Sequence, residues 1–146
     1  MQRVWEESPS GLHKGLFPET SRFFDMEPTN YIKINNGKVT ARLDVVFYKE
    51  DGITYAYAPS LDLVGYDTHV EGAKRSFEIV LNEYLKYGIE NNTLSEDLTR
   101  HGWLSSREEE FDSPQFAVIL QKSKQLQRVV NNNYRKVSRR FSYNVC

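Results

Sequence analysis

The spacing of apolar residues changes near residue 68, and this change constrains the fold more than any other feature of the sequence. Before it, apolar and polar side chains alternate over about 39–48 and again over about 53–58, which predicts strands that bury one face. After it, apolar residues return every three or four positions over about 69–87, which predicts a helix. The apolar stripe of this helix contains Val70, Ala73, Phe77, Val80, Leu81, Tyr84 and Leu85. Such a stripe packs across the apolar face of a sheet, so we predict an α+β fold with a small antiparallel sheet.

Turn and capping signals give the order of these elements. The segments Asn36-Gly37 and Glu50-Asp51-Gly52 are typical of tight turns, so the strands on either side of residues 50–52 are expected to form a hairpin. A third short strand over 63–66 completes a β-β-β-α order. Thr68, with a glutamate three residues later, has the spacing of a capping box, and Gly88 is expected to end the helix.

The remaining segments are predicted from their helix-breaking, turn and helix-start residues. Residues 1–29 are expected to be a disordered extension, because proline and glycine interrupt each short apolar cluster. The α+β domain is expected over 30–104, with a second short helix near its end, and a polar linker over 105–112 follows it. Residues 113–146 are expected to form a C-terminal helix over about 114–130 and then an extended basic tail.

Charge is distributed unevenly along the chain, although the formal net charge is only −1. Residues 113–146 contain no acidic residue, whereas the rest of the chain carries 12 of the 19 Lys and Arg and all 20 acidic residues. A sign difference of this kind is typical of a segment that contacts nucleic acid, or of one that packs on an acidic body or partner. The candidate nucleic-acid-binding residues are Lys122, Lys124, Arg128, Arg135, Lys136, Arg139 and Arg140.

Composition excludes several classes of protein. The one cysteine, Cys146, excludes a disulfide framework and a cysteine-based zinc cluster. No apolar run approaches the roughly 20 residues of a membrane span, and the N-terminus has no apolar leader, so a cytoplasmic protein is expected. The glycines form neither a phosphate loop nor a dinucleotide fingerprint, so we expect no cofactor.

The sequence contains no recognisable catalytic motif, and a protein without enzymatic activity is expected. None of His13, His69 and His101 stands beside a serine or cysteine in a nucleophile motif. A metal-dependent nuclease stays open as an alternative, because converging carboxylates can hold Mg²⁺. Its ligands would come from four aspartates, Asp44, Asp51, Asp62 and Asp67.

The order of the motifs over about 38–104 is more distinctive than any one of them. A strand leads into Glu50-Asp51-Gly52, an aromatic strand follows, and the chain then reads Pro59-Ser60-Leu61-Asp62-Leu63-Val64-Gly65-Tyr66 before a Thr68-started helix with Ala73 in its first turns. This order resembles the HicB antitoxin family. The resemblance implies a truncated, ribonuclease-H-like domain without catalytic carboxylates, which oligomerises and neutralises a small HicA-type toxin, an mRNA-cleaving ribonuclease.

We therefore predict an antitoxin-like binding protein whose acidic body contacts a small basic HicA-like toxin and which forms a homo-oligomer. The predicted toxin-contacting residues are Glu50, Asp51, Asp62, Asp67, Tyr55 and Tyr57. The resemblance does not extend to a DNA-binding module, because one helix followed by an extended tail is neither a helix-turn-helix nor a ribbon-helix-helix. A DNA-binding transcriptional repressor that acts through residues 113–146 remains an alternative on charge alone.

Overall fold

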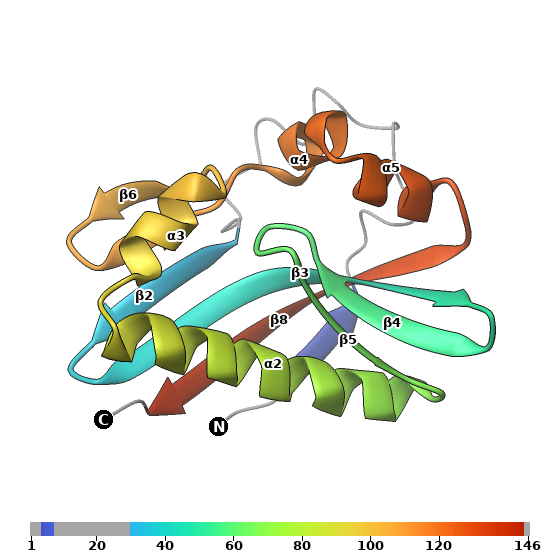
Figure 1. Cartoon of the computed structure of the whole chain (residues 1–146), viewed down its shortest axis with the longest axis horizontal. Helices are drawn as coiled ribbons and strands as arrows, with labels where there is room; N and C mark the ends of the chain where they lie inside the picture. Colours follow the sequence, from blue (N-terminus) through green and yellow to red (C-terminus); the bar gives the residue numbers. More distant parts are fainter. Residues whose placement is uncertain (1–3, 8–29, 145–146) are drawn as a thin grey trace.

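A computed structural model describes residues 4–7 and 30–144 of the 146-residue chain (Figure 1). Within this part, three consecutive strands form an antiparallel meander and a long helix follows them, so the predicted β-β-β-α order and the α+β class are confirmed. These elements are β3 (Lys38–Glu50), β4 (Ile53–Ala58), β5 (Leu63–Asp67) and α2 (Val70–Glu90). The β3–β4 turn is made by Asp51 and Gly52, whose φ angles of 53° and 79° are those of the predicted two-residue hairpin.

The segment predicted as an extended basic tail is extended, but it forms a strand inside the sheet rather than a tail. Strand β8 (Tyr134–Asn144) pairs with β3 from Tyr48 opposite Tyr134 to Lys38 opposite Asn144. Its apolar residues Val137 and Phe141 join the core beneath α2, which accounts for its position inside the sheet. Strand β1 (Val4–Glu7), from the predicted N-terminal extension, pairs with the outer edge of β8. The rest of that extension lies outside the described residues.

The predicted linker over 105–112 is also wrong, because most of it forms a hairpin that extends the sheet. Strand β2 (Tyr31–Asn35) pairs with β3, and β7 (Glu110–Asp112) pairs with β2. Strand β6 (Leu104–Arg107) pairs with β7 across an irregularity, and all four of its residues are exposed. Short polar strands of this kind have no alternating apolar pattern, so their place in a sheet depends on the neighbouring strand.

The described residues thus form one eight-stranded sheet in which every pairing is antiparallel. The main order is β1-β8-β3-β2-β7-β6, and β4 and β5 extend from the other half of the β3 edge that β2 occupies. None of the helices in the described ranges is long and apolar enough to cross a membrane.

Helices cover both faces of the meander. On one face α2 packs with Phe77, Leu81 and Leu85 fully buried, and α3 (Leu94–Arg100) lies beside its C-terminal end (Figure 1). On the other face Leu126 and Val129 cover Val46, Tyr48 and Tyr57. Val46 and Tyr48 belong to the face of β3 that alternation assigned to solvent, so this half of β3 is buried on both sides.

The single helix predicted over 114–130 is two helices, α4 (Phe116–Lys122) and α5 (Lys124–Val130). The break falls at Ser123, whose backbone is extended and whose Oγ accepts a hydrogen bond of 3.0 Å from the backbone N–H of Leu126. A serine side chain that caps the following helix in this way makes a new helix start more stable than continuation of the old one.

The ends of α2 also differ from the prediction. His69 is the N-cap and makes no side-chain capping bond, while the Thr68 hydroxyl contacts Asp67 and His69, so the predicted capping box does not form. The helix continues past Gly88 to Glu90. Gly88 is buried, and a Cβ on it would lie 3.0 Å from Leu94, so this glycine serves close packing rather than helix termination.

Candidate protein-binding site

The predicted toxin-contacting residues lie at two ends of the β3–β4–β5 meander and do not form one surface. Tyr57 is only 5% exposed, and its hydroxyl donates a 3.0 Å hydrogen bond to Asp62 Oδ1 in the β4–β5 loop. Burial raises the pKa of Tyr57, and the Asp62 carboxylate raises it further. Tyr57 is therefore a core residue beneath α5, and its predicted role as a contact is wrong.

Tyr55 belongs to a row of tyrosines across neighbouring strands. The register places Tyr134, Tyr48, Tyr55 and Tyr66 opposite one another on β8, β3, β4 and β5. The rings of Tyr48 and Tyr55 stack with centroids 5.0 Å apart, and those of Tyr55 and Tyr66 are 6.0 Å apart. Tyr66 is 61% exposed at the sheet edge and was not among the predicted site residues.

Glu50 links the predicted toxin-contacting residues to the predicted nucleic-acid-binding residues. Its carboxylate pairs with the guanidinium of Arg128 on α5, so a predicted toxin contact and a predicted nucleic-acid contact neutralise each other. The hydrogen bond that Arg128 donates to Glu50 raises the pKa of Arg128. Asp51 is exposed at the tip of the adjacent turn.

Asp67 has a local role at the start of α2. Its Oδ1 accepts hydrogen bonds of 2.5 Å from the Thr68 backbone N–H and 3.2 Å from the Thr68 hydroxyl. These bonds favour the ionised form, so the backbone bond from Thr68 above all lowers the pKa of Asp67. A carboxylate beside the first turn also interacts favourably with the helix dipole.

The seven basic residues of the C-terminal segment do not form one surface either. Arg139 is fully buried, and its Nη1 lies 2.5 Å from Glu78 Oε2, so a nucleic-acid contact by Arg139 is wrong. Lys136 lies 3.9 Å from Asp44 and 4.4 Å from the centre of the Phe116 ring. Along β8 the side chains alternate, so Arg135 and Arg139 point to one face of the sheet and Lys136 and Arg140 to the other. The residues that remain exposed are Lys122, Lys124, Arg128, Arg135 and Arg140.

The four aspartates of the metal-dependent alternative are not brought together. Asp44 lies in the middle of β3, where it accepts hydrogen bonds from Ser138 Oγ at 2.7 Å and Asn30 Nδ2 at 3.2 Å. Asp51, Asp62 and Asp67 lie in two different turns and at the end of β5. Across residues 4–7 and 30–144, no three His, Cys, Asp or Glu side chains form a group that could hold a metal ion.

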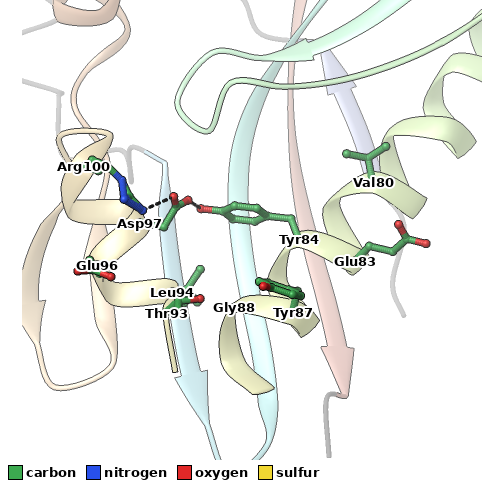
Figure 2. A pocket seen from close by; sticks show the side chains of 10 residues that line it. All are labelled: Val80, Glu83, Tyr84, Tyr87, Gly88, Thr93, Leu94, Glu96, Asp97 and Arg100. Atoms are coloured by element: carbon green, nitrogen blue, oxygen red, sulfur yellow. Dashed lines mark hydrogen bonds and ion pairs between the residues drawn. The ribbon is translucent and has the colours of Figure 1, made fainter. Parts of the chain in front are cut away.

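A groove between the C-terminal half of α2 and α3 is a candidate site on the described part of the chain (Figure 2). Its volume is about 710 Å³. It is lined by Val80, Glu83, Tyr84, Tyr87, Gly88, Thr93, Leu94, Glu96, Asp97 and Arg100. Volumes of this order are typical of binding pockets.

A series of hydrogen bonds fixes the side chains along one wall of the groove. The Tyr84 hydroxyl donates to Asp97 Oδ2, and Arg100 Nη2 donates to Asp97 Oδ1 at 2.9 Å (Figure 2). Burial and the Asp97 carboxylate raise the pKa of Tyr84. Tyr84 belongs to the predicted apolar stripe of α2, whereas Tyr87, which is 67% exposed, lies outside it and was not a predicted site residue. An aromatic residue outside the predicted apolar stripe was the sequence signal that could have pointed to this groove.

The raised pKa of Tyr84 predicts a loss of stability at alkaline pH. The folded protein holds this phenolic proton above the ordinary pKa of 10.0, so its contribution is complete below about pH 10 and is lost as the pH rises further. We expect the free energy of unfolding to fall by up to about 1.4 kcal/mol per pH unit for each such tyrosine. Urea unfolding between pH 8 and 11 measures this, and Tyr84→Phe should reduce the slope. The same slope in Tyr84→Phe as in the wild type would contradict the assignment; Tyr87→Phe is the exposed control.

Comparisons of the chain with protein-family models, with curated proteins and with solved structures find no match. The described residues form an α+β fold with one antiparallel sheet and a groove between α2 and α3.

Proposed function

We propose that this protein is an antitoxin-like binding protein without enzymatic activity, which neutralises a small HicA-type mRNA-cleaving ribonuclease in the cytoplasm. One observation carries the proposal. The segment 38–104 that resembles HicB folds as a continuous meander with α2 across it, followed by α3. This arrangement is compatible with the degraded ribonuclease-H-like domain that the resemblance implies, and that correspondence is part of the proposal.

The proposed mechanism is steric occlusion. A ribonuclease that binds RNA carries a basic surface, and an acidic partner steers and holds such a surface. Outside residues 113–146 this chain has 20 acidic and 12 basic residues. Two of the basic residues inside that segment, Arg128 and Arg139, pair with Glu50 and Glu78 of the same chain. The basic segment is thus partly neutralised within the fold. Other acidic side chains, on α2 and α3, remain available to a partner.

Co-expression tests the proposal. The full chain is produced together with each small open reading frame that flanks its gene, and the complexes are purified and weighed by light scattering, which also reports homo-oligomers. We expect a stable complex with a small basic protein that degrades mRNA and stops growth when expressed alone, and growth that recovers when this chain is present. A toxic neighbour that neither binds the chain nor is neutralised by it would contradict the proposal, as would the absence of any toxic or bound neighbour.

A further inference from the structure

We infer that the α2–α3 groove is the docking site for a segment of the basic partner in which an apolar side chain is flanked by Lys or Arg. This inference rests on the proposed function and names the surface that carries it. The groove has an apolar floor and acidic residues at its rim. The floor favours the apolar side chain of the partner, and the rim favours its Lys or Arg side chains.

The floor of the groove is apolar and held in place. Leu94 is 4% exposed, and it packs closely on Gly88 because that residue has no side chain. The Tyr84 ring forms the adjacent wall, and its hydroxyl is held by Asp97, which Arg100 also contacts. A floor whose side chains are already ordered costs little entropy on binding, so an apolar side chain of the partner gains most of its burial energy there.

The rim of the groove carries acidic side chains without cationic partners. Glu83 projects from α2 and Glu96 from α3, and both are exposed (Figure 2). Within residues 4–7 and 30–144, neither has an ion pair. Five other carboxylates do have one inside the chain, those of Asp44, Glu50, Glu71, Glu78 and Asp97. The two rim carboxylates are therefore free to pair with cations from outside.

Tyr87 completes the recognition surface. It lines the groove and is 67% exposed, which is a large exposure for an aromatic side chain. A tyrosine ring covers the apolar stem of a Lys or Arg and attracts its charged end. Tyrosine is also enriched among residues that dominate the energy of protein interfaces. With Glu83 one helical turn before it, Tyr87 favours a basic side chain over a purely apolar one.

A basic partner fits this groove better than a second copy of the chain does. The chain's own basic segment has already placed Arg128 and Arg139 in ion pairs, and Lys136 lies near Asp44. Its α4 offers Val118 and Lys122 on the exposed side, which makes self-association a distinct and measurable outcome. The groove volume of about 710 Å³ suits a few side chains, so we assign it the central contact of a larger interface.

The test measures the affinity of the purified basic partner, the product of the flanking open reading frame, for groove variants of the full chain. We expect Tyr87→Ala to weaken binding about tenfold and the charge reversal Glu83→Lys/Glu96→Lys to weaken it about 100-fold at low salt. Matched controls are Ile79→Ala, an exposed apolar residue of α2 outside the groove, and the charge reversal Glu108→Lys/Asp112→Lys on the β6–β7 hairpin. Both controls should bind like the wild type, and thermal unfolding verifies that every variant folds.

Three results would overturn the inference, and they are distinguishable. Groove variants that are folded and bind the partner like the wild type would place the contact elsewhere and leave the proposed function intact. A wild-type chain that binds no flanking product would remove the proposed function together with its site. Wild-type self-association that is lost only in the groove variants, with partner binding unchanged, would assign the groove to a second copy of the chain.

Discussion

Replacing Glu78 by Leu is expected to lower the free energy of unfolding by about 3–5 kcal/mol, because it leaves the charge of Arg139 in the core. The Arg139 side chain is fully buried, the Glu78 side chain is 10% exposed, and Nη1 and Oε2 are 2.5 Å apart. The guanidinium also lies 4.6 Å from the centre of the Phe141 ring. A buried cation that loses its carboxylate recovers neither its hydration nor the lost Coulomb attraction.

A double-mutant cycle separates the ion pair from the shape of the site. Arg139→Met alone should also destabilise the protein, because it leaves the Glu78 carboxylate largely buried without its cation. The double variant Glu78→Leu/Arg139→Met should be more stable than either single variant, because apolar side chains of similar volume then fill the same space. Urea unfolding of the four proteins measures the coupling. Additive losses would show that the pair contributes no interaction energy.

Replacing Gly65 by Ala is expected to destabilise the protein by about 3 kcal/mol, at the upper end of the overpacking range. Gly65 lies in the middle of β5 directly beneath α2, and a Cβ there would lie 2.6 Å from the Phe77 Cα and close to its backbone nitrogen. Backbone atoms of a helix cannot turn aside as a side chain does, so the whole helix must move away from the strand. The core between α2 and the sheet would open at Phe77, which is fully buried.

Gly72→Ala is the matched control for this prediction. A Cβ on Gly72 would meet the Asp67 side chain, which is exposed and can rotate into solvent. The loss of the Asp67–Thr68 contact is offset by the higher helix propensity of alanine, so we expect a change of less than about 1 kcal/mol. Thermal unfolding of both variants makes the comparison. A Gly65→Ala protein as stable as Gly72→Ala would show that α2 is not seated tightly on β5.

Local patterns predicted the meander and its helix correctly because the relevant interactions are between near neighbours. The alternation over β3 and β4, the Asp51-Gly52 turn and the stripe of α2 depend on residues only a few positions apart. The break at Ser123 was less predictable, because a serine is tolerated within a helix as well as at its start, and the preference for a cap depended on how α5 packs over Tyr48 and Tyr57.

Site residues were harder to predict than strands, because their roles depend on distant partners. The sequence made Arg139 a candidate for nucleic acid, yet β8 pairs with β3 in a register that turns it toward Glu78 on α2. It made Glu50 a toxin contact, yet α5 brings Arg128 onto it. Charge type is visible in a sequence, whereas the partner that neutralises a charge is 61 positions away in one case and 78 in the other.

The sequence by itself determined the α+β class, the β3–β4–β5–α2 order and the face of α2 that is buried. The reason is that the period of the apolar residues indicates both the type of element and its buried face. Only the tertiary structure decided what covers each apolar face. It placed β8 beside β3, buried the second face of β3 beneath α5, and opened a groove between α2 and α3. These features arise from packing between segments far apart in the chain, and periodicity within one segment contains no information about the segment that packs against it.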